Sequence, residues 1–165
     1  MAKREISVFI DVENVMSIGE WTSRPSQLER LLESILETVG RLGYIIAELQ
    51  GYASLKRSHG KVSVDKRRRL GKVFLKHSGR LFWSGVIADH SLMADIQQRL
   101  DHKTLPDTVA IVSGDGDFVP IIQSLKTAGH HVLISGFRGK MNAELRRTAN
   151  QVVYLQLPFT PRWLE

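Results

Sequence analysis

The stretch Ser113-Gly114-Asp115-Gly116-Asp117-Phe118 places two carboxylates and two glycines between two different hydrophobic patterns. The apolar run before it, 108–112, predicts a buried strand, and residues 119–128 predict a helix. In open α/β sheets, ligands bind outside the carboxyl ends of the strands. Two acids at that position favour a divalent cation site, and we expect the two glycines to let the backbone turn sharply there.

Outward from this stretch, strand and helix patterns alternate about five times along the chain. Strands are predicted over 6–10, 44–53, 80–86, 108–112 and 131–135, with 151–157 as a last strand or an extended tail. Helices are predicted over 26–42, 64–77, 91–101, 118–128 and 142–148. Short connections between alternating elements are typical of an α/β fold. We therefore expect a three-layer α/β/α, Rossmann-like arrangement with a mainly parallel five-stranded central sheet.

The length of 165 residues predicts a single domain, with a core over about 5–157 and a C-terminal tail over 158–165. Because the chain contains no cysteine, disulfides and cysteine-ligated zinc are excluded. No apolar run approaches the ~20 residues that a membrane span needs. We therefore expect a cytoplasmic protein without a membrane partner.

The net charge of +6 is concentrated in one segment of the chain. Residues 56–80 carry ten basic residues and one acid, whereas the remainder carries 13 basic and 16 acidic residues. Such a segment is typical of a phosphate-binding surface, the alternative being a solvated helix face. We predict that nucleic acid binds to the basic residues Lys56, Arg57, Lys61, Lys66, Arg67, Arg68 and Arg69.

Two further acids accompany the pair in the opening stretch. Asp11 comes directly after the strand 6–10, and in a doubly wound sheet of flavodoxin-type or similar order we expect that strand to lie beside 108–112. Asp95 lies among apolar positions near the start of a helix, where a carboxylate needs a partner or a metal. The alternative for Asp95 is a first-turn acid that complements the helix dipole.

We predict that four carboxylates converge on one crevice: Asp11, Asp95, Asp115 and Asp117. A bound cation would remove the repulsion between them. Ligands that are all oxygen favour Mg²⁺ or Mn²⁺. Such a site can activate a water and stabilise the leaving oxygen of a phosphodiester.

These motifs, in this order and spacing, resemble those of NYN domains, which are similar to PIN-domain nucleases. Asp11-Val12-Glu13-Asn14 resembles the family's D-x-E-N signature, and Ser113–Phe118 resembles its S-G-D-G-D-F motif. Ala94-Asp95-Ile96, with Asp101 six residues on, resembles its V-D-V stretch. On a straight helix Asp101 lies about 240° around the axis from Asp95, so we expect it to be peripheral.

The resemblance covers nearly the whole chain and is closest to the bacterial LabA-like branch. It implies a PIN-like fold and a metal-dependent ribonuclease. The four carboxylates would then be both metal ligands and catalytic residues, with Asn14 and Ser113 as auxiliary residues. Two further candidates are Trp21, which could stack on a base, and His90, which could act as an acid or base.

Three hypotheses follow for the function. The first is a ribonuclease that uses Mg²⁺ or Mn²⁺ and holds the RNA backbone through the basic segment. The second is a non-catalytic RNA-binding or regulatory module that retains the acidic pocket. The third is a phosphatase or nucleotidase, which would leave the basic segment unexplained. RNA is the expected partner in the first two, and the sequence leaves open whether the chain forms a homo-oligomer.

Overall fold

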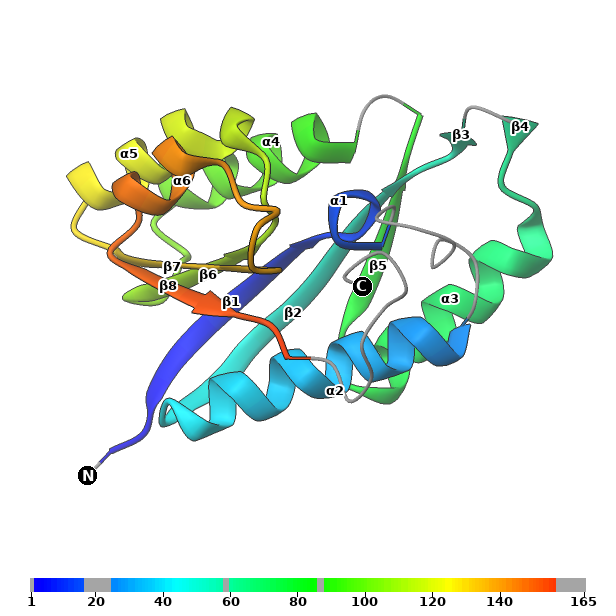
Figure 1. The fold of residues 1–165 in the computed structure, drawn as a ribbon, viewed down its shortest axis with the longest axis horizontal. Coiled ribbons are helices and arrows are strands. Elements are labelled where there is room, and N and C mark those ends of the chain that lie inside the picture. The colour runs from blue at the N-terminus through cyan, green and yellow to red at the C-terminus, as the bar shows by residue number, and fades with distance from the viewer. Residues whose placement is uncertain (1, 17–24, 58–59, 86–87, 157–165) are drawn as a thin grey trace.

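The computed structural model describes residues 2–16, 25–57, 60–85 and 88–156 and contains a six-stranded parallel sheet (Figure 1). The strand order is β5-β2-β1-β6-β7-β8. The strands are β1 (Arg4–Asp11), β2 (Tyr44–Ser54), β5 (Arg80–Ser84), β6 (Thr108–Val112), β7 (His131–Gly136) and β8 (Gln151–Tyr154). A separate antiparallel pair consists of β3 (Lys56–Arg57) and β4 (Gly60–Lys61).

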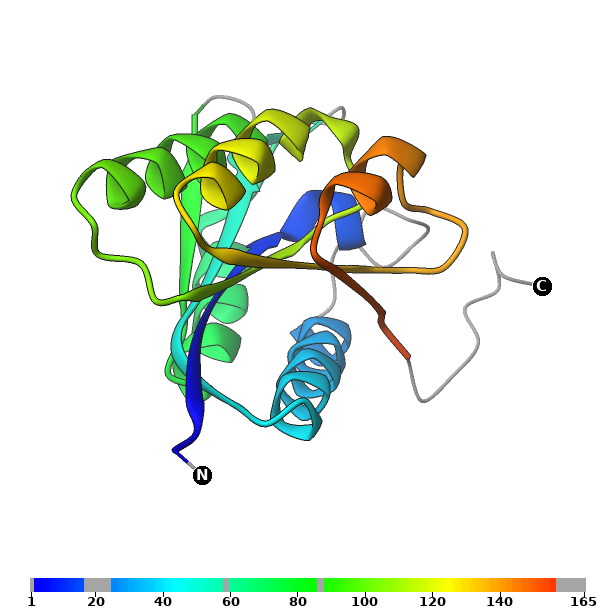
Figure 2. The ribbon, with the colours of Figure 1, turned by 90° about the vertical axis from the view of Figure 1, so that its left-hand side faces the viewer.

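Helices cover both faces of this sheet, as Figures 1 and 2 show. The helices are α1 (Val12–Met16), α2 (Pro25–Arg41), α3 (Val64–Lys76), α4 (Ala88–Asp101), α5 (Val119–Thr127) and α6 (Ala143–Thr148), with a 3₁₀ turn η1 (Gly116–Phe118). Apolar residues of α2 and α3 form one core with one face of the sheet, and those of α4, α5 and α6 form a second core with the other face. Among the described residues, every helix is too short or too polar to cross a bilayer.

The prediction of a five-stranded sheet was wrong, because β8 is a sixth strand. It pairs in parallel with β7, with Ile134 opposite Val152. Its four residues are only half-buried at the edge of the sheet, so their pattern resembles that of an extended tail. In sequence order the strands run 3-2-1-4-5-6, which is the Rossmann order and not the flavodoxin order.

The neighbour relation that matters for the site is confirmed, since β1 and β6 lie side by side with Ile10 opposite Val112. Both strands are buried along the sheet, which suits their apolar sequences. The strand order reverses between them, and this is where α/β sheets open a crevice at their carboxyl ends. Asp11 and Ser113 therefore end up at the same edge of the sheet.

Candidate metal centre

Asp11, the last residue of β1, is a buried carboxylate at this edge, with 4% of its surface exposed. Its Oδ2 accepts a hydrogen bond from Ser113 Oγ at 3.2 Å, and its Oδ1 accepts one from the backbone N–H of Asn14 at 3.4 Å. Burial is the largest influence on the pKa of Asp11, which is raised from 3.8 to about 7. The charges of Asp89 and Asp115 raise this pKa further, and the two hydrogen bonds oppose the increase.

Three more carboxylates form a cluster beside Asp11. Asp89, Asp115 and Asp117 each offer an oxygen, and these oxygens lie within 4.8 Å of one another. Asp89 comes from the first turn of α4, whereas the other two come from the turn that follows β6. We call these three residues together with Asp11 the acidic cluster. Their repulsion is the physical feature that a bound cation would relieve.

The two predicted auxiliary residues connect the strand ends that carry the acidic cluster. The side-chain Oδ1 of Asn14 accepts a hydrogen bond from the backbone N–H of Gly114 at 2.8 Å. Ser113 Oγ, which donates to Asp11, accepts from the N–H of Asp115 at 3.2 Å. Asn14 and Ser113 thus hold the turn after β6 against the end of β1.

The glycines of this turn serve a purpose other than the expected one. Neither Gly114 nor Gly116 has a positive φ angle, so the turn does not require left-handed backbone at either position. A Cβ on Gly114 would instead lie 2.1 Å from the carbonyl oxygen of Lys140, and one on Gly116 would lie 2.8 Å from the side chain of Asn142. Close packing of the 140–142 segment therefore demands glycine here. Phe118 is fully buried and anchors the turn in the core.

Asp95, which we predicted to join the cluster, has other partners in the structure. It accepts hydrogen bonds from the hydroxyl of Tyr52 and from Arg99 Nε, the latter at 3.1 Å. Arg99 also forms an ion pair with Glu48 of β2. Burial and the bond to Asp95 both raise the pKa of the Tyr52 hydroxyl, which stays protonated and donates. Asp95 is thus an ion-paired and hydrogen-bonded carboxylate that ties α4 to β2.

Asp89 is the residue that sequence reasoning missed. The predicted helix began at residue 91, so Asp89 was interpreted as part of a turn, whereas α4 begins at Ala88. The signal was present in the sequence, because an acid followed six residues later by a second acid also fits Asp89 and Asp95. In that alignment with the V-D-V stretch, Ala88-Asp89-His90 takes the place that we gave to Ala94-Asp95-Ile96.

The start of α4 is held against the end of β2 and against α1 by a chain of hydrogen bonds. The N–H of Ala88 donates to Ser54 Oγ at 3.1 Å. Ser54 donates in turn to the carboxylate of Glu13, from its N–H at 2.8 Å and from its hydroxyl at 3.1 Å. Glu13, the glutamate of the D-x-E-N signature, therefore positions Asp89 indirectly. It holds Ser54 at the end of β2, and Ser54 bonds to the first residue of α4.

The acidic cluster fits a hard divalent cation. Its donors are all carboxylate oxygens, which suit Mg²⁺ or Mn²⁺. Within the described parts of the chain, no salt bridge involves any of its four acids. Three of the acids stand on two separate elements and converge with no lysine or arginine partner from residues 2–16, 25–57, 60–85 or 88–156, which is the arrangement that a metal ion would complete.

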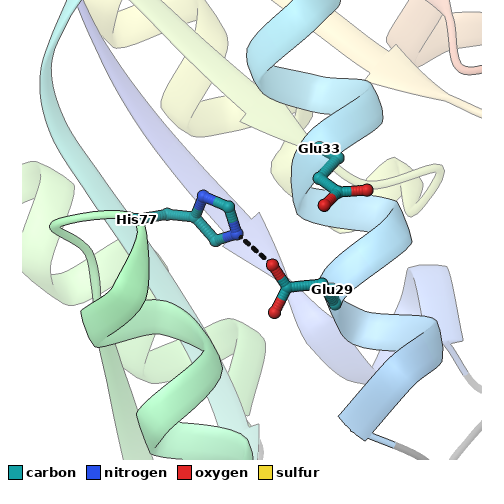
Figure 3. A group of neighbouring side chains, drawn as sticks. All are labelled: Glu29, Glu33 and His77. Atoms are coloured by element: carbon teal, nitrogen blue, oxygen red, sulfur yellow. Dashed lines mark hydrogen bonds and ion pairs between the residues drawn. The ribbon is translucent and has the colours of Figure 1, made fainter.

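A second group of possible metal ligands, Glu29, Glu33 and His77, lies between α2 and α3 (Figure 3). Here the protein supplies its own partners for the glutamate. Glu29 Oε1 lies 3.0 Å from Lys76 Nζ and 2.7 Å from His77 Nε2. The bond from Lys76 lowers the pKa of Glu29, and the bond from His77 adds to this effect. This group is therefore satisfied as an ion-paired contact between two helices.

The predicted nucleic-acid-binding residues differ in their environments. Arg68 and Arg69 both pair with Asp65 on the exposed side of α3. Lys61 is exposed, and the N–H of Lys66 donates to the helix-capping Ser63. Lys56 and Arg57 form β3, but their side chains lie outside what the structure describes, as do Trp21 and the tail 158–165.

The hairpin β3–β4 and the first turn of α3 lie at the same end of the sheet as α1 and the start of α4 (Figure 1). The elements that carry these basic residues and the elements that carry the acidic cluster therefore share the carboxyl edge of the sheet. His90 lines a groove with Asp117 at this edge, together with Gly116 and Glu144.

Comparisons with known proteins agree with this fold. The family model described as NYN domain matches residues 5–156. A crystal structure of a protein of unknown function from Vibrio parahaemolyticus is similar with a TM-score of 0.69 and 17% sequence identity, over 93% of this chain and 94% of that one. At this identity the likeness concerns the fold alone. No curated protein matches the chain.

Proposed function

Because the chain belongs to the NYN domain family, we propose that it is a metal-dependent ribonuclease, of the LabA-like branch, that hydrolyses RNA phosphodiesters. The observation that carries this proposal is the convergence of Asp89, Asp115 and Asp117 within 4.8 Å, beside the buried Asp11. In this assignment Asp89 takes the ligand position that we had predicted for Asp95. Asp95 is assigned a positioning role, since it is already paired with Arg99 and bonded to the hydroxyl of Tyr52.

The residues of the acidic cluster and the two auxiliary residues divide three tasks in the proposed reaction. A bound Mg²⁺ or Mn²⁺ would supply Lewis-acid chemistry, by lowering the pKa of a water and polarising a phosphoryl oxygen. Asp89, Asp115 and Asp117 would hold the ion from two sides. Burial is the chief reason that Asp11 favours its protonated form, and the positive charge of a bound cation would favour the carboxylate form instead. Asn14 and Ser113 would keep this geometry rigid.

RNA is the substrate class that the charge distribution favours. Seven of the ten basic residues of 56–80 belong to the hairpin or to the first turns of α3, and these elements lie at the same end of the sheet as α1 and the start of α4. Contacts from lysine and arginine to phosphates position a nucleic acid without reading its sequence. A small phosphate ester would leave this surface without a task, so the nucleotidase hypothesis is less favoured.

The test is hydrolysis of a labelled single-stranded RNA with Mn²⁺, comparing the wild-type protein with Asp115→Asn and Asp89→Asn. Loss of an outer-shell partner of a metal ligand typically costs 10–100-fold, so loss of a ligand itself should cost at least about 100-fold. We expect that decrease in the cleavage rate for both variants. Equal cleavage by all three proteins would mean that the activity does not come from this site.

Asp95→Asn and Asp101→Asn are the matched controls on α4. Asp101 is exposed and bonds only to Gln97 among the described residues, so its variant should cleave like wild type. Asp95→Asn should cleave within about tenfold of wild type, provided that circular dichroism shows it folded. A loss for Asp95→Asn that matches the loss for Asp89→Asn would return Asp95 to the metal site. RNA binding without cleavage under any metal would favour the non-catalytic module.

A further inference from the structure

We propose that Lys61 and Arg67 form a pocket that binds one backbone phosphate of single-stranded RNA beside the acidic cluster. The proposal rests on the proposed function for the nature of the ligand. A cavity of about 240 Å³ lies between the hairpin and α3, lined by Leu55, Lys61, Val62, Arg67 and Gly85. Two of these five residues are cations and none is a carboxylate, so the cavity suits an anion.

Arg67 carries a donor that lacks an acceptor. Its Nε is shielded from solvent and has no hydrogen-bond partner among the described residues. A buried donor without an acceptor costs free energy, and the cost is greater for a charged group. The Arg67 side chain lines the cavity, where a phosphate oxygen would supply an acceptor for its guanidinium group. Guanidinium groups bind phosphates through two parallel hydrogen bonds, which adds geometric specificity to the charge.

The neighbouring arginines lack this property. Arg68 and Arg69 follow directly on α3, yet both bond to the carboxylate of Asp65, Arg68 at 2.9 Å. Their side chains are about two-thirds exposed, at 67% and 66%. Three successive arginines therefore fall into two groups, with Arg67 turned to the cavity and the other two paired at the surface. A phosphate should gain most from Arg67.

The end of β2 connects the pocket to the helix start that carries Asp89 of the acidic cluster. Leu55 follows Ser54, whose Oγ accepts from the N–H of Ala88, the residue before Asp89. The other wall is fixed by the N–H of Val62, which donates to the carbonyl of Leu55 at 2.9 Å. Because neighbouring strands are about 4.8 Å apart, the ends of β1 and β5 are separated by roughly 10 Å. An RNA strand that crosses this edge can place one phosphate at the cluster and another in the pocket.

The experiment measures binding of a fluorescent single-stranded RNA by anisotropy, without divalent metal and in the Asp115→Asn background, so that cleavage plays no part. We expect Arg67→Ala and Lys61→Ala each to weaken binding about tenfold. Each should also lower the slope of log affinity against log salt by about 0.7, the value for one phosphate contact on a single strand. Arg68→Ala and Arg69→Ala, the matched controls, should change affinity less than about threefold.

Equal losses of RNA affinity for Arg67→Ala and Arg68→Ala would overturn the proposed phosphate pocket, since binding would then depend on diffuse positive charge. Lys61 is exposed, so its variant tests the pocket even if Arg67→Ala fails to fold. A direct readout is the Arg67 Nε–H resonance, which should shift when the RNA is added. A shift with inorganic phosphate but none with RNA would also overturn the proposal. Absence of RNA binding in every protein would instead reject RNA as the ligand of the proposed function.

Discussion

Asp11 shows how the site is built at the expense of stability. Its folded-state pKa of about 7 lies above the ordinary 3.8 of an unfolded chain, chiefly because of burial. The folded state therefore holds this proton more tightly than the unfolded state does. The contribution of Asp11 to the free energy of unfolding is fully present below about pH 4 and is lost as the pH rises to about 7. A residue selected only for folding would not be a carboxylate here.

We predict that Asp11→Asn stabilises the metal-free protein at neutral pH. The pKa difference sets an upper bound of roughly 4 kcal/mol, and the lost acceptor for Ser113 or Asn14 will reduce the gain. Denaturant unfolding in EDTA between pH 4 and pH 8 measures the difference in the free energy of unfolding between the variant and wild type. The advantage of the variant should disappear toward pH 4. An Asp11→Asn variant that is less stable than wild type at pH 8 would contradict a destabilising burial of the Asp11 carboxylate. Asp101→Asn is the control at an exposed carboxylate and should leave the stability unchanged.

At the scale of elements, the turn after β6 is shaped by what packs against it. The N–H of Asn142 donates to the carbonyl of Gly114 at 2.9 Å, and the side chain of Asn142 caps α6. The S-G-D-G-D-F motif thus joins β6 to the segment before α6 in addition to presenting two acids. Its glycines are required by this contact, which no local reading of the turn could reveal.

We predict that Gly114→Ala destabilises the protein by about 1–3 kcal/mol, since the new methyl would overlap the Lys140 carbonyl. For a chain of this length that corresponds to a loss of roughly 3–10 °C in Tm. Gly71→Ala is the matched control, because a Cβ there meets nothing within 4 Å and α3 gains about 0.5–1 kcal/mol in helix propensity. Scanning calorimetry should show opposite signs for the two variants. An unchanged Tm for Gly114→Ala would contradict the close packing.

At the scale of the whole molecule, hydrophobic period and strand-end acids were enough to predict an α/β fold with a parallel sheet and β1 beside β6. The sixth strand was missed because β8 is short and half-buried, and only its pairing with β7 identifies it. The site was predicted less completely. Asp95 attracts attention as an acid among apolar residues. Helix spacing alone indicates its pairing with Arg99, four positions on in the same predicted helix, whereas the hydrogen bond from Tyr52, 43 positions away, has no local signature.

The acid that was missed depends on a boundary that sequence defines poorly. Asp89 became part of a predicted turn because its helix begins three residues earlier than its apolar pattern. The hydrogen bond from Ala88 to Ser54 fixes that start, and the two residues lie 34 positions apart. A contact over such a separation has no local signature. The helix start that places Asp89 therefore comes from the tertiary structure, and the six-residue spacing of Asp89 and Asp95 was the one sequence signal for this acid.

The most direct measurement is the anomalous scattering of Mn²⁺ in crystals of the protein. We predict one or more peaks within about 2.5 Å of carboxylate oxygens of Asp89, Asp115 and Asp117, with Asp11 alongside, and their loss in Asp89→Asn. A peak only at Glu29, Glu33 and His77, or Mn²⁺ bound by Asp95 in place of Asp89, would contradict the account.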